Sequence, residues 1–177
     1  MLNDKQLLAK AKQLDPIALE MLHQRFYEPV ARYIQFKVSD IQTAEDLSSE
    51  VFVRVLDGLK QGRSWKTSAK GWIMGIAHHV VVDHYRHKER IQEVILTETL
   101  SDSEENNPSY QFMVGERKRA LMQAIDHLTD EQRDVILMRF IEGINIEGVA
   151  EALQKSPGAV KGLQYRAMRV LAKKLVN

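Results

Sequence analysis

The chain of 177 residues contains no cysteine. Disulfides, thiolate catalysis and cysteine-based zinc sites are therefore excluded, and the composition fits a reducing compartment, for which the cytoplasm is the expected location. Long apolar runs are also missing, since no stretch approaches the roughly 20 apolar residues of a membrane span. Asp4, Lys5 and Lys10 interrupt the N-terminal pattern, unlike the apolar core of a signal peptide. No membrane insertion is expected.

Charge of one sign is absent from two segments, although the formal net charge is only +1. Residues 91–116 contain six acidic side chains and no Lys or Arg. Residues 152–177 contain six basic side chains and no Asp or Glu. The second imbalance indicates either an anionic partner or a well-solvated face.

Strand-like alternation is confined to the short stretch 94–96, and helical periodicity dominates everywhere else. We therefore expect an all-α protein. The helices of the first half are expected over 4–14, 16–36, 43–59 and 68–90. The second should be kinked or interrupted at Pro29, because a proline ring removes one backbone hydrogen bond of the helix.

The segment Ser101 to Ser109 is polar, acidic and contains a proline, a composition that does not support a packed core. We therefore expect two small helical domains, over residues 1–92 and 116–177, joined by an acidic flexible linker over 93–115. Its composition is already explained as that of a solvated tether.

The second domain carries clear helix signals. Thr129 and Gln132 have the spacing of a capping box, in which each side chain accepts a hydrogen bond from a free backbone N–H. The helix that follows should end at Gly143, since glycine readily adopts the left-handed conformation after a helix. Asn145 can cap a second, short helix over 146–153.

A further helix should begin after a two-residue turn, with Ser156 as its N-cap and Pro157 at its first position. Two short helices joined by a tight turn, the second of them basic, fit a helix-turn-helix that enters the DNA major groove. The alternative is an amphipathic C-terminal helix with a solvated basic face. The candidate DNA contacts are Ser156, Gly158, Ala159, Lys161, Gln164, Tyr165, Arg166 and Arg169.

Residues 128–171 resemble region 4 of the bacterial sigma-70 family, specifically of its extracytoplasmic-function (ECF) group. Residues 44–55 resemble region 2.2, and residues 72–79 together with 83–86 resemble regions 2.3 and 2.4. The resemblance covers nearly the whole chain in the order region 2, linker, region 4.

The resemblance implies a sigma factor, which is not an enzyme and needs no cofactor or metal. Region 2 (1–92) would bind core RNA polymerase and recognise and melt the minus-ten promoter element, and region 4 (116–177) would read the minus-thirty-five element. The implied partners are the clamp helices of the largest polymerase subunit, the flap of the second subunit, promoter DNA and an anti-sigma factor. The acidic linker would imitate nucleic acid inside polymerase.

The resemblance also implies roles for residues of the first domain. Those that dock on polymerase would be Asp46, Leu47, Glu50, Val51 and Phe52. Those that contact the minus-ten element would be Trp65, Lys66, His78, His79, Asp83, Arg86 and Lys88. An aromatic ring beside basic residues suits stacking on an unpaired base, and we expect Trp65 in its loop to be available and Trp72 to lie in the core.

Five positions depart from the common family pattern. His78 and His79 stand where the family commonly has Arg and Asn, Gly148 where Glu is usual, and Gly162 and Leu163 where Ser and Arg are frequent. Gly148 should weaken its helix by about 1 kcal/mol relative to Ala. The loss of one base-reading Arg at 163 makes the promoter sequence unpredictable from the family.

Two other functions fit parts of the sequence. A DNA-binding regulator could use the helix-turn-helix without serving polymerase, and it would not need Asp46 or Phe52. A metal-dependent hydrolase could use the histidines between His78 and His87, because His79 and Asp83 have the i,i+4 spacing of helical metal ligands. The remaining ligands and glutamate of known helical zinc motifs are missing.

Overall fold

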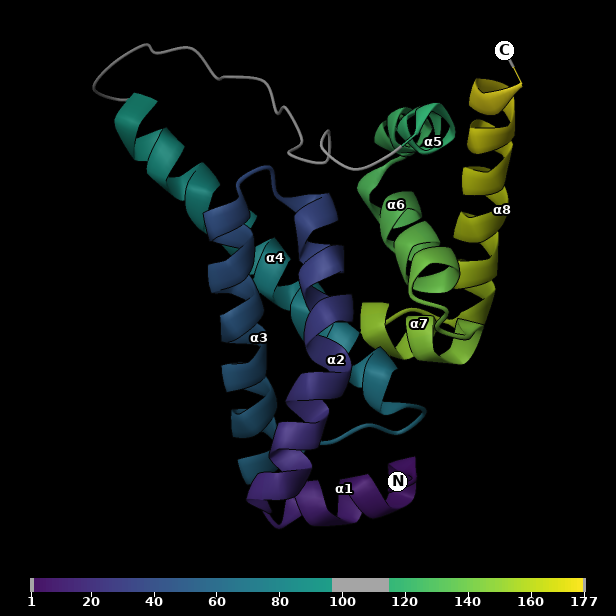
Figure 1. Ribbon diagram of the computed structural model, residues 1–177. Coiled ribbons are helices and arrows are strands. Elements are labelled where there is room, and N and C mark those ends of the chain that lie inside the picture. The colour runs from purple at the N-terminus through teal and green to yellow at the C-terminus, as the bar shows by residue number, and fades with distance from the viewer. Residues whose placement is uncertain (1, 97–114, 177) are drawn as a thin grey trace.

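The computed structural model describes residues 2–96 and 115–176, and every regular element in these ranges is helical, which confirms the all-α fold (Figure 1). The first lobe contains α1 (Asp4–Lys12), α2 (Pro16–Lys37), α3 (Ile41–Lys60) and α4 (Ala69–Leu96). The second lobe contains α5 (Glu116–Asp126), α6 (Asp130–Ile136), the π-helix η2 (Leu137–Ile141), α7 (Ile146–Leu153) and α8 (Pro157–Leu175). No helix among the described residues is long and apolar enough to cross a membrane.

Two features of the first lobe differ from expectation. Of the two alternatives at Pro29, an interruption does not occur, because α2 continues as one helix through the proline, with Phe26 and Val30 on either side buried in the core. Helix α4 continues to Leu96, so residues 94–96 form its last turn rather than a strand-like stretch. The expected linker over 93–115 therefore begins inside α4, and its segment Ser101 to Ser109 lies outside the described residues.

The helix signals of the second lobe are confirmed. The Thr129–Gln132 capping box is formed, Gly143 has a φ of 67°, and the side chains of Asn145 and Ser156 cap α7 and α8. The sequence did not reveal that α6 would continue as a five-residue π-helix. The turn between α7 and α8 is made by Gln154, which adopts the left-handed conformation with φ 53°.

The two lobes share one hydrophobic core. Helix α4 of the first lobe packs directly on α7 of the second, and a continuous cluster joins Ile73 and Met74 to Val149 and Ala152. A smaller cluster lies between α5, α6 and α8, around Leu171. The two expected domains are thus in direct contact through α4 and α7.

Glycines allow α4 and α7 to approach each other at backbone distance. A Cβ atom on Gly71 would lie 3.2 Å from the Cα of Gly148, and one on Gly75 would lie 3.0 Å from the Cα of Ala152. A Cβ on Gly148 itself would lie 2.7 Å from Ile144 Cγ2. This packing explains why position 148 is a glycine despite the lower helix propensity of that residue.

The substitution Gly75→Val should separate the lobes, because its side chain would collide with the backbone of Ala152. We expect a loss of about 1–3 kcal/mol in the free energy of unfolding, measured by urea denaturation, and a larger radius of gyration in X-ray scattering. Gly158→Val is the matched control, since the nearest atom to a Cβ there is 4.0 Å away. Equal effects of both substitutions would contradict the close helix contact.

Candidate nucleic-acid interface

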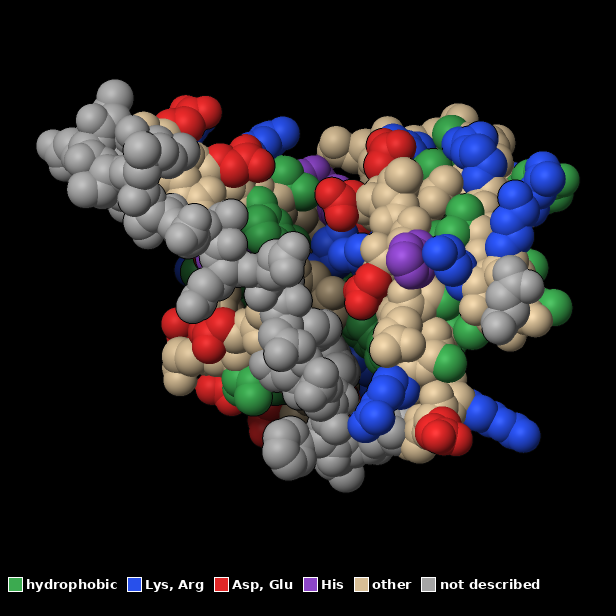
Figure 2. All heavy atoms as spheres, turned by 90° about the horizontal axis from the view of Figure 1, so that it is seen from above, with side chains coloured by type: hydrophobic (Ala, Val, Ile, Leu, Met, Phe, Trp, Pro, Cys, Tyr) green, Lys and Arg blue, Asp and Glu red, His purple; other side chains and the backbone are tan. Residues whose placement is uncertain are grey.

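Helix α8 presents a basic face to solvent. Val160, Leu163 and Ala167 point into the core, which leaves seven of the eight predicted DNA contacts exposed: Ser156, Gly158, Ala159, Lys161, Tyr165, Arg166 and Arg169. Figure 2 shows Lys and Arg side chains gathered along the right-hand edge, where α8 lies in Figure 1. The exposed face begins at the N-terminal end of the helix, the end that meets base edges in a helix-turn-helix.

Gln164, the eighth predicted contact, is half-buried at the edge of this face. Arg139 of the π-helix donates from Nε to Gln164 Oε1 at 3.1 Å, and from Nη1 to the carbonyl oxygen of Ile144 at 2.7 Å. Because Arg has only donors, the amide oxygen of Gln164 is the atom held by Arg139. Sequence reasoning missed Arg139, since only the π-helix brings it to α8. Leu163 is a core residue, which accounts for the missing Arg at that position.

The aromatic residues of the first lobe differ from expectation. Trp65 is buried, with 8% of its surface exposed, and its ring lies 6.0 Å from that of Trp72, which is half-buried. Trp72 is less buried than expected, although it packs against the core and a Cβ on the buried Gly58 of α3 would lie 3.1 Å from its Cζ2. Lys66, next to Trp65 in the loop, is exposed. A base that stacked on Trp65 would require the loop to move.

The other predicted minus-ten residues occupy two sides of α4. His78 and Arg86 line the cleft between the lobes. His79 and Asp83 are exposed on another side, where Asp83 accepts a 2.8 Å hydrogen bond from Arg54 of α3, and Lys88 is exposed further along the helix. The predicted set is therefore not a single surface.

The predicted polymerase-docking residues divide into surface and core. Leu47 and Val51 are buried and hold α3 against the first lobe, which leaves them unavailable as contacts in this arrangement. Asp46 is exposed, Glu50 pairs with Arg54 at 2.6 Å, and Phe52 is partly buried.

Sequence reasoning missed three residues on this side of the first lobe. His23 and Tyr27 of α2 pack beside Phe52, with ring centroids 4.7 Å and 6.1 Å from it. Val53, 59% exposed, follows Asp46 by seven residues and so lies on the same face of α3. The i, i+4, i+7 spacing of Asp46, Glu50 and Val53 could have identified this face.

A buried ion pair joins α6 to the first lobe. The carboxylate of Asp134, 3% exposed, lies 2.8 Å from Lys37 Nζ and 3.4 Å from His78 Nδ1, and it accepts a 2.9 Å hydrogen bond from Tyr33. Burial raises the pKa of Asp134, but the hydrogen bond from His78 and the charge of Lys37 outweigh burial and hold that pKa below its usual value. Burial, followed by the neighbouring Asp134, raises the pKa of Tyr33 well above its usual value.

A second buried carboxylate, Glu142, follows the π-helix and is 4% exposed. Arg32 of α2 binds it through two nitrogens, at 2.7 and 3.2 Å, and Lys70 of α4 lies 3.3 Å from it. Lys70 also donates to the backbone carbonyl of Glu142. Two cations of the first lobe therefore share one anion of the second.

The loop before α4 is held by a third carboxylate. Glu151 of α7 accepts hydrogen bonds from the backbone N–H groups of Lys66 at 3.0 Å and Thr67 at 2.9 Å. Burial raises the pKa of Glu151, but these backbone hydrogen bonds outweigh it and lower the pKa below its usual value. Glu151 thus fixes the loop that the sequence associates with the minus-ten element.

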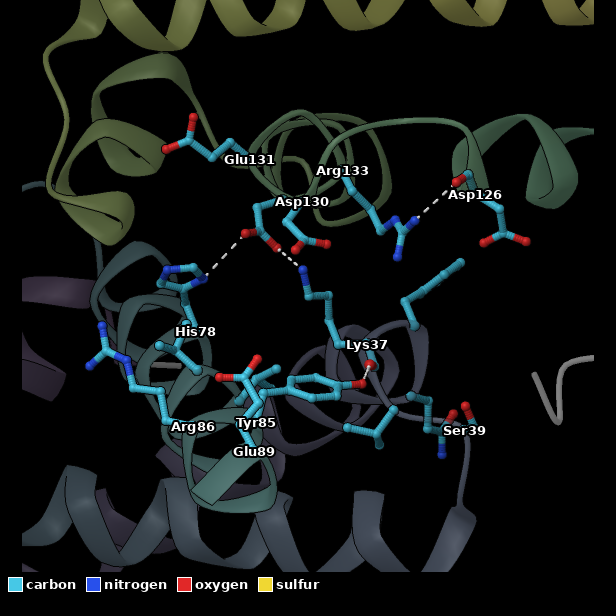
Figure 3. A pocket seen from close by; sticks show the side chains of 16 residues that line it. Lys37, Ser39, His78, Tyr85, Arg86, Glu89, Asp126, Asp130, Glu131 and Arg133 are labelled. Carbon is cyan, nitrogen blue, oxygen red and sulfur yellow. Dashed lines mark hydrogen bonds and ion pairs between the residues drawn. The ribbon is translucent and has the colours of Figure 1, made fainter. Parts of the chain in front are cut away.

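An open cleft of about 790 Å³ lies between the lobes beside the Asp134 pair. Figure 3 shows Lys37, His78 and Tyr85 on its first-lobe side and Asp130, Glu131 and Arg133 on its second-lobe side. Tyr85 donates to the backbone carbonyl of Lys37 and so fixes the end of α2 beside the cleft.

The histidines of α4 do not converge on a common point. His78 contacts Tyr33 of its own lobe and Asp134 of the second lobe, whereas His79 bonds to the carbonyl oxygen of Gly75 in its own helix. Within residues 2–96 and 115–176 no three His, Asp or Glu side chains could jointly hold a metal ion.

Replacing Asp134 with Asn should destabilise the chain by about 3 kcal/mol at pH 7, since it leaves the charge of Lys37 buried without its partner. The Asp134 pKa is lowered in the folded chain, so the carboxylate stabilises it above the unfolded pKa of about 3.9, and this contribution disappears as the pH falls through the folded pKa. The free energies of unfolding of the unmodified chain and of Asp134→Asn, measured with urea, should therefore converge below about pH 4. The exposed Asp126→Asn serves as control, and a difference independent of pH would refute the ion pair.

Comparison with known families matches both lobes. Sigma-70 region 2 matches residues 22–91, and Sigma-70, region 4 matches residues 118–171. The chain is 33% identical over 162 residues to the ECF RNA polymerase sigma factor SigX of Bacillus subtilis, which covers 87% of this chain and 81% of SigX. It is also 33% identical over 175 residues to the ECF RNA polymerase sigma factor BldN of Streptomyces coelicolor, covering 96% of this chain but 65% of BldN.

Two solved structures share the fold. CnrH, solved in complex with the cytosolic domain of CnrY, superposes with a TM-score of 0.69 at 19% identity, over 97% of this chain and 96% of that one. The sigma factor RpoE of Bartonella quintana, solved with the anti-sigma factor NepR, gives a TM-score of 0.65 at 17% identity, over 88% and 95% of the two chains. Both family matches occur in the order that the sequence predicted. The chain belongs to the extracytoplasmic-function group of the sigma-70 family of RNA polymerase sigma factors.

Proposed function

We propose that this chain directs promoter-specific transcription initiation as a subunit of RNA polymerase in the cytoplasm, without catalysing a reaction itself. The observation that carries the proposal is the exposed, acid-free face of α8, which follows α7 through the tight turn at Gln154. This geometry suits insertion of α8 into the major groove. In this function α8 reads the minus-thirty-five element and the first lobe melts and reads the minus-ten element.

Polymerase is the proposed partner of the outer face of α3. Asp46 and Glu50 supply negative charge there, and Val53 supplies an exposed apolar surface between charged neighbours. Such a combination suits a helix-on-helix interface with a basic partner, because charge complementarity orients the contact and apolar burial stabilises it. The aromatic group of His23, Tyr27 and Phe52 lies beside this face.

An anti-sigma factor is the second proposed protein partner. The relatives with the same fold support it, since the RpoE structure holds the anti-sigma factor NepR. The exposed residues at which such a partner would compete with polymerase are those of the α3 face.

The charge reversal Asp46→Arg should abolish co-elution with core RNA polymerase in size-exclusion chromatography, and adding Phe52→Ala should not restore it. The reason is that an exposed carboxylate is exchanged for a cation opposite a basic partner surface. Glu45→Arg is the matched control, because Glu45 is the exposed neighbour of Asp46 on α3 but points about 100° away around the helix. The control should co-elute normally.

Failure of the unmodified chain to bind a core enzyme that accepts another sigma factor would contradict the proposal. A DNA-binding regulator independent of polymerase would then be the better description of the chain.

Lys161→Ala should weaken duplex binding by the holoenzyme about ten-fold, as expected for one good base contact, and should relax the base preference at one position. Selection of bound sequences from a random duplex pool measures both effects. Lys173→Ala is the control, because it removes an equal charge from the last turn of α8. Binding should also weaken steeply with salt, since phosphate contacts release counterions. A flat salt response would count against α8 as a DNA element.

A further inference from the structure

Three carboxylates of the second lobe, which we call the interlobe carboxylates, find their hydrogen-bond and ion-pair partners in the first lobe. They are Asp134, Glu142 and Glu151, from α6, the residue after the π-helix, and α7. All side-chain hydrogen bonds and ion pairs described above for these three carboxylates cross the boundary between the lobes.

The first of the three binding sites on the first lobe is cationic and buried. Lys37 and His78 converge on Asp134 from α2 and α4, as Figure 3 shows for the two first-lobe side chains. The side chain of Lys37 is only 8% exposed. A lysine so deeply buried needs an anionic partner, so Lys37 must find another anion, or water, whenever the lobes separate.

The second site has the geometry of an oxyanion fork. Arg32 donates two parallel hydrogen bonds to the two oxygens of Glu142, and Lys70 adds its charge from α4. Arg binds carboxylates and phosphates in this same bidentate manner. The carboxylate is 1% exposed, so no other anion reaches the site in the closed arrangement.

The third site is made by the backbone. Consecutive N–H groups of Lys66 and Thr67 point at the two oxygens of Glu151, an arrangement that binds phosphate as readily as carboxylate. The site lies in the loop that carries Trp65, whose ring makes a tilted contact with that of Trp72 in α4. Anion binding and aromatic stacking are the two components of single-strand recognition.

We propose that these three sites form a phosphate-binding track for single-stranded DNA on the first lobe, and that the interlobe carboxylates occupy this track when the lobes are closed. The inference rests on the proposed function, in that the first lobe binds the melted promoter strand. Lys70 and His78 are eight residues apart on α4, which is about 12 Å at 1.5 Å per residue. The track therefore spans a few nucleotides.

Occupation of the track by the second lobe makes the chain self-inhibiting for minus-ten binding. The carboxylates and a DNA backbone carry the same charge and accept hydrogen bonds from the same donors, so they exclude each other. Helix α8 stays exposed in the closed arrangement. Closure therefore blocks the binding of the melted strand and leaves the duplex-reading helix accessible.

The test uses the full chain without polymerase and a fluorescein-labelled 20-nucleotide oligodeoxythymidine as probe, with affinity measured by fluorescence anisotropy. The isosteric variant D134N/E142Q/E151Q removes the three anions. It should bind the probe at least ten-fold more tightly than the unmodified chain. Its plot of log affinity against log salt concentration should be steeper by about 2, because each phosphate bound on a single strand adds about 0.7.

A charge-matched control separates occupation of the track from general repulsion. E116Q/E131Q/E147Q removes three exposed carboxylates of the same lobe, of which Glu131 pairs with Lys155 in its own lobe. This variant should bind the probe within about two-fold of the unmodified chain, as expected for screened surface charges. E151Q alone, at the edge of the interface, should give a smaller gain and carries little risk of misfolding.

Opening by steric means provides an independent variant. Gly75→Val keeps all three carboxylates but should part the lobes. Energy transfer between two dyes can follow this separation. The dyes would be attached to cysteines introduced at Lys10 and Lys174, and the labelling is specific because the natural chain contains no cysteine. Probe affinity should rise as the lobes part. An unchanged affinity in both D134N/E142Q/E151Q and opened Gly75→Val, or an equal gain in the charge-matched control, overturns the proposal. Because polymerase is absent, this result is independent of the co-elution test.

Discussion

The arrangement of the two lobes depends on the burial of two carboxylates, Asp134 and Glu142. A buried charge without a partner is strongly destabilising, and both side chains are almost completely removed from water. Their partners are Lys37, Arg32 and Lys70 of the first lobe. The cations of the first lobe thus neutralise the buried carboxylates of the second. This pairing requires α6 and α7 to lie over α2 and α4.

Backbone contact between α4 and α7 makes these ion pairs possible. Gly71 and Gly75 bring the axis of α7 close enough for Glu151 to reach the loop before α4, and for α6 to place Asp134 over Lys37. Gly148 completes the contact from the other side. A Cβ atom at position 148 would lie 3.5 Å from Ser68 Oγ of the first lobe, and it would also meet Ile144 and Asn145 of its own lobe.

Local signals made much of the fold predictable. The caps at Asn145 and Ser156 and the Thr129–Gln132 box depend on a few neighbouring residues, so their sequence patterns were sufficient, and the exposed face of α8 followed from its periodicity. The extent of α4 and the π-helix were not predicted, and the choice between a kink and an interruption of α2 at Pro29 stayed open, because tertiary packing decides these features. Burial of Trp65 and the turn of His78 toward Asp134 depend on contacts between distant segments, which periodicity does not reveal.

The same distinction applies to the site. The resemblance identified His78 as a DNA contact. In the structure, however, the side chain of His78 faces Asp134, which is 56 positions away in the sequence and belongs to no motif. Arg32 and Lys37 lie in α2 without any pattern that marks them as a binding surface. Only the structure reveals that Arg32, Lys37 and Lys70 of the first lobe, together with His78, converge on carboxylates of the second.

Opening of the lobes has an energetic consequence for the order of binding. When the binding-competent form is a small fraction of the molecules, apparent affinity falls by that fraction, so a melted strand meets a closed chain with reduced affinity. The exposed α3 face and α8 have no such reduction. Polymerase and duplex DNA can therefore bind before the track is free, and each exchange of a carboxylate for a phosphate replaces one anion by another beside the same cation. The free energy needed to open the lobes then comes from loss of the apolar contact between α4 and α7. A partner that binds the open chain must supply at least this free energy.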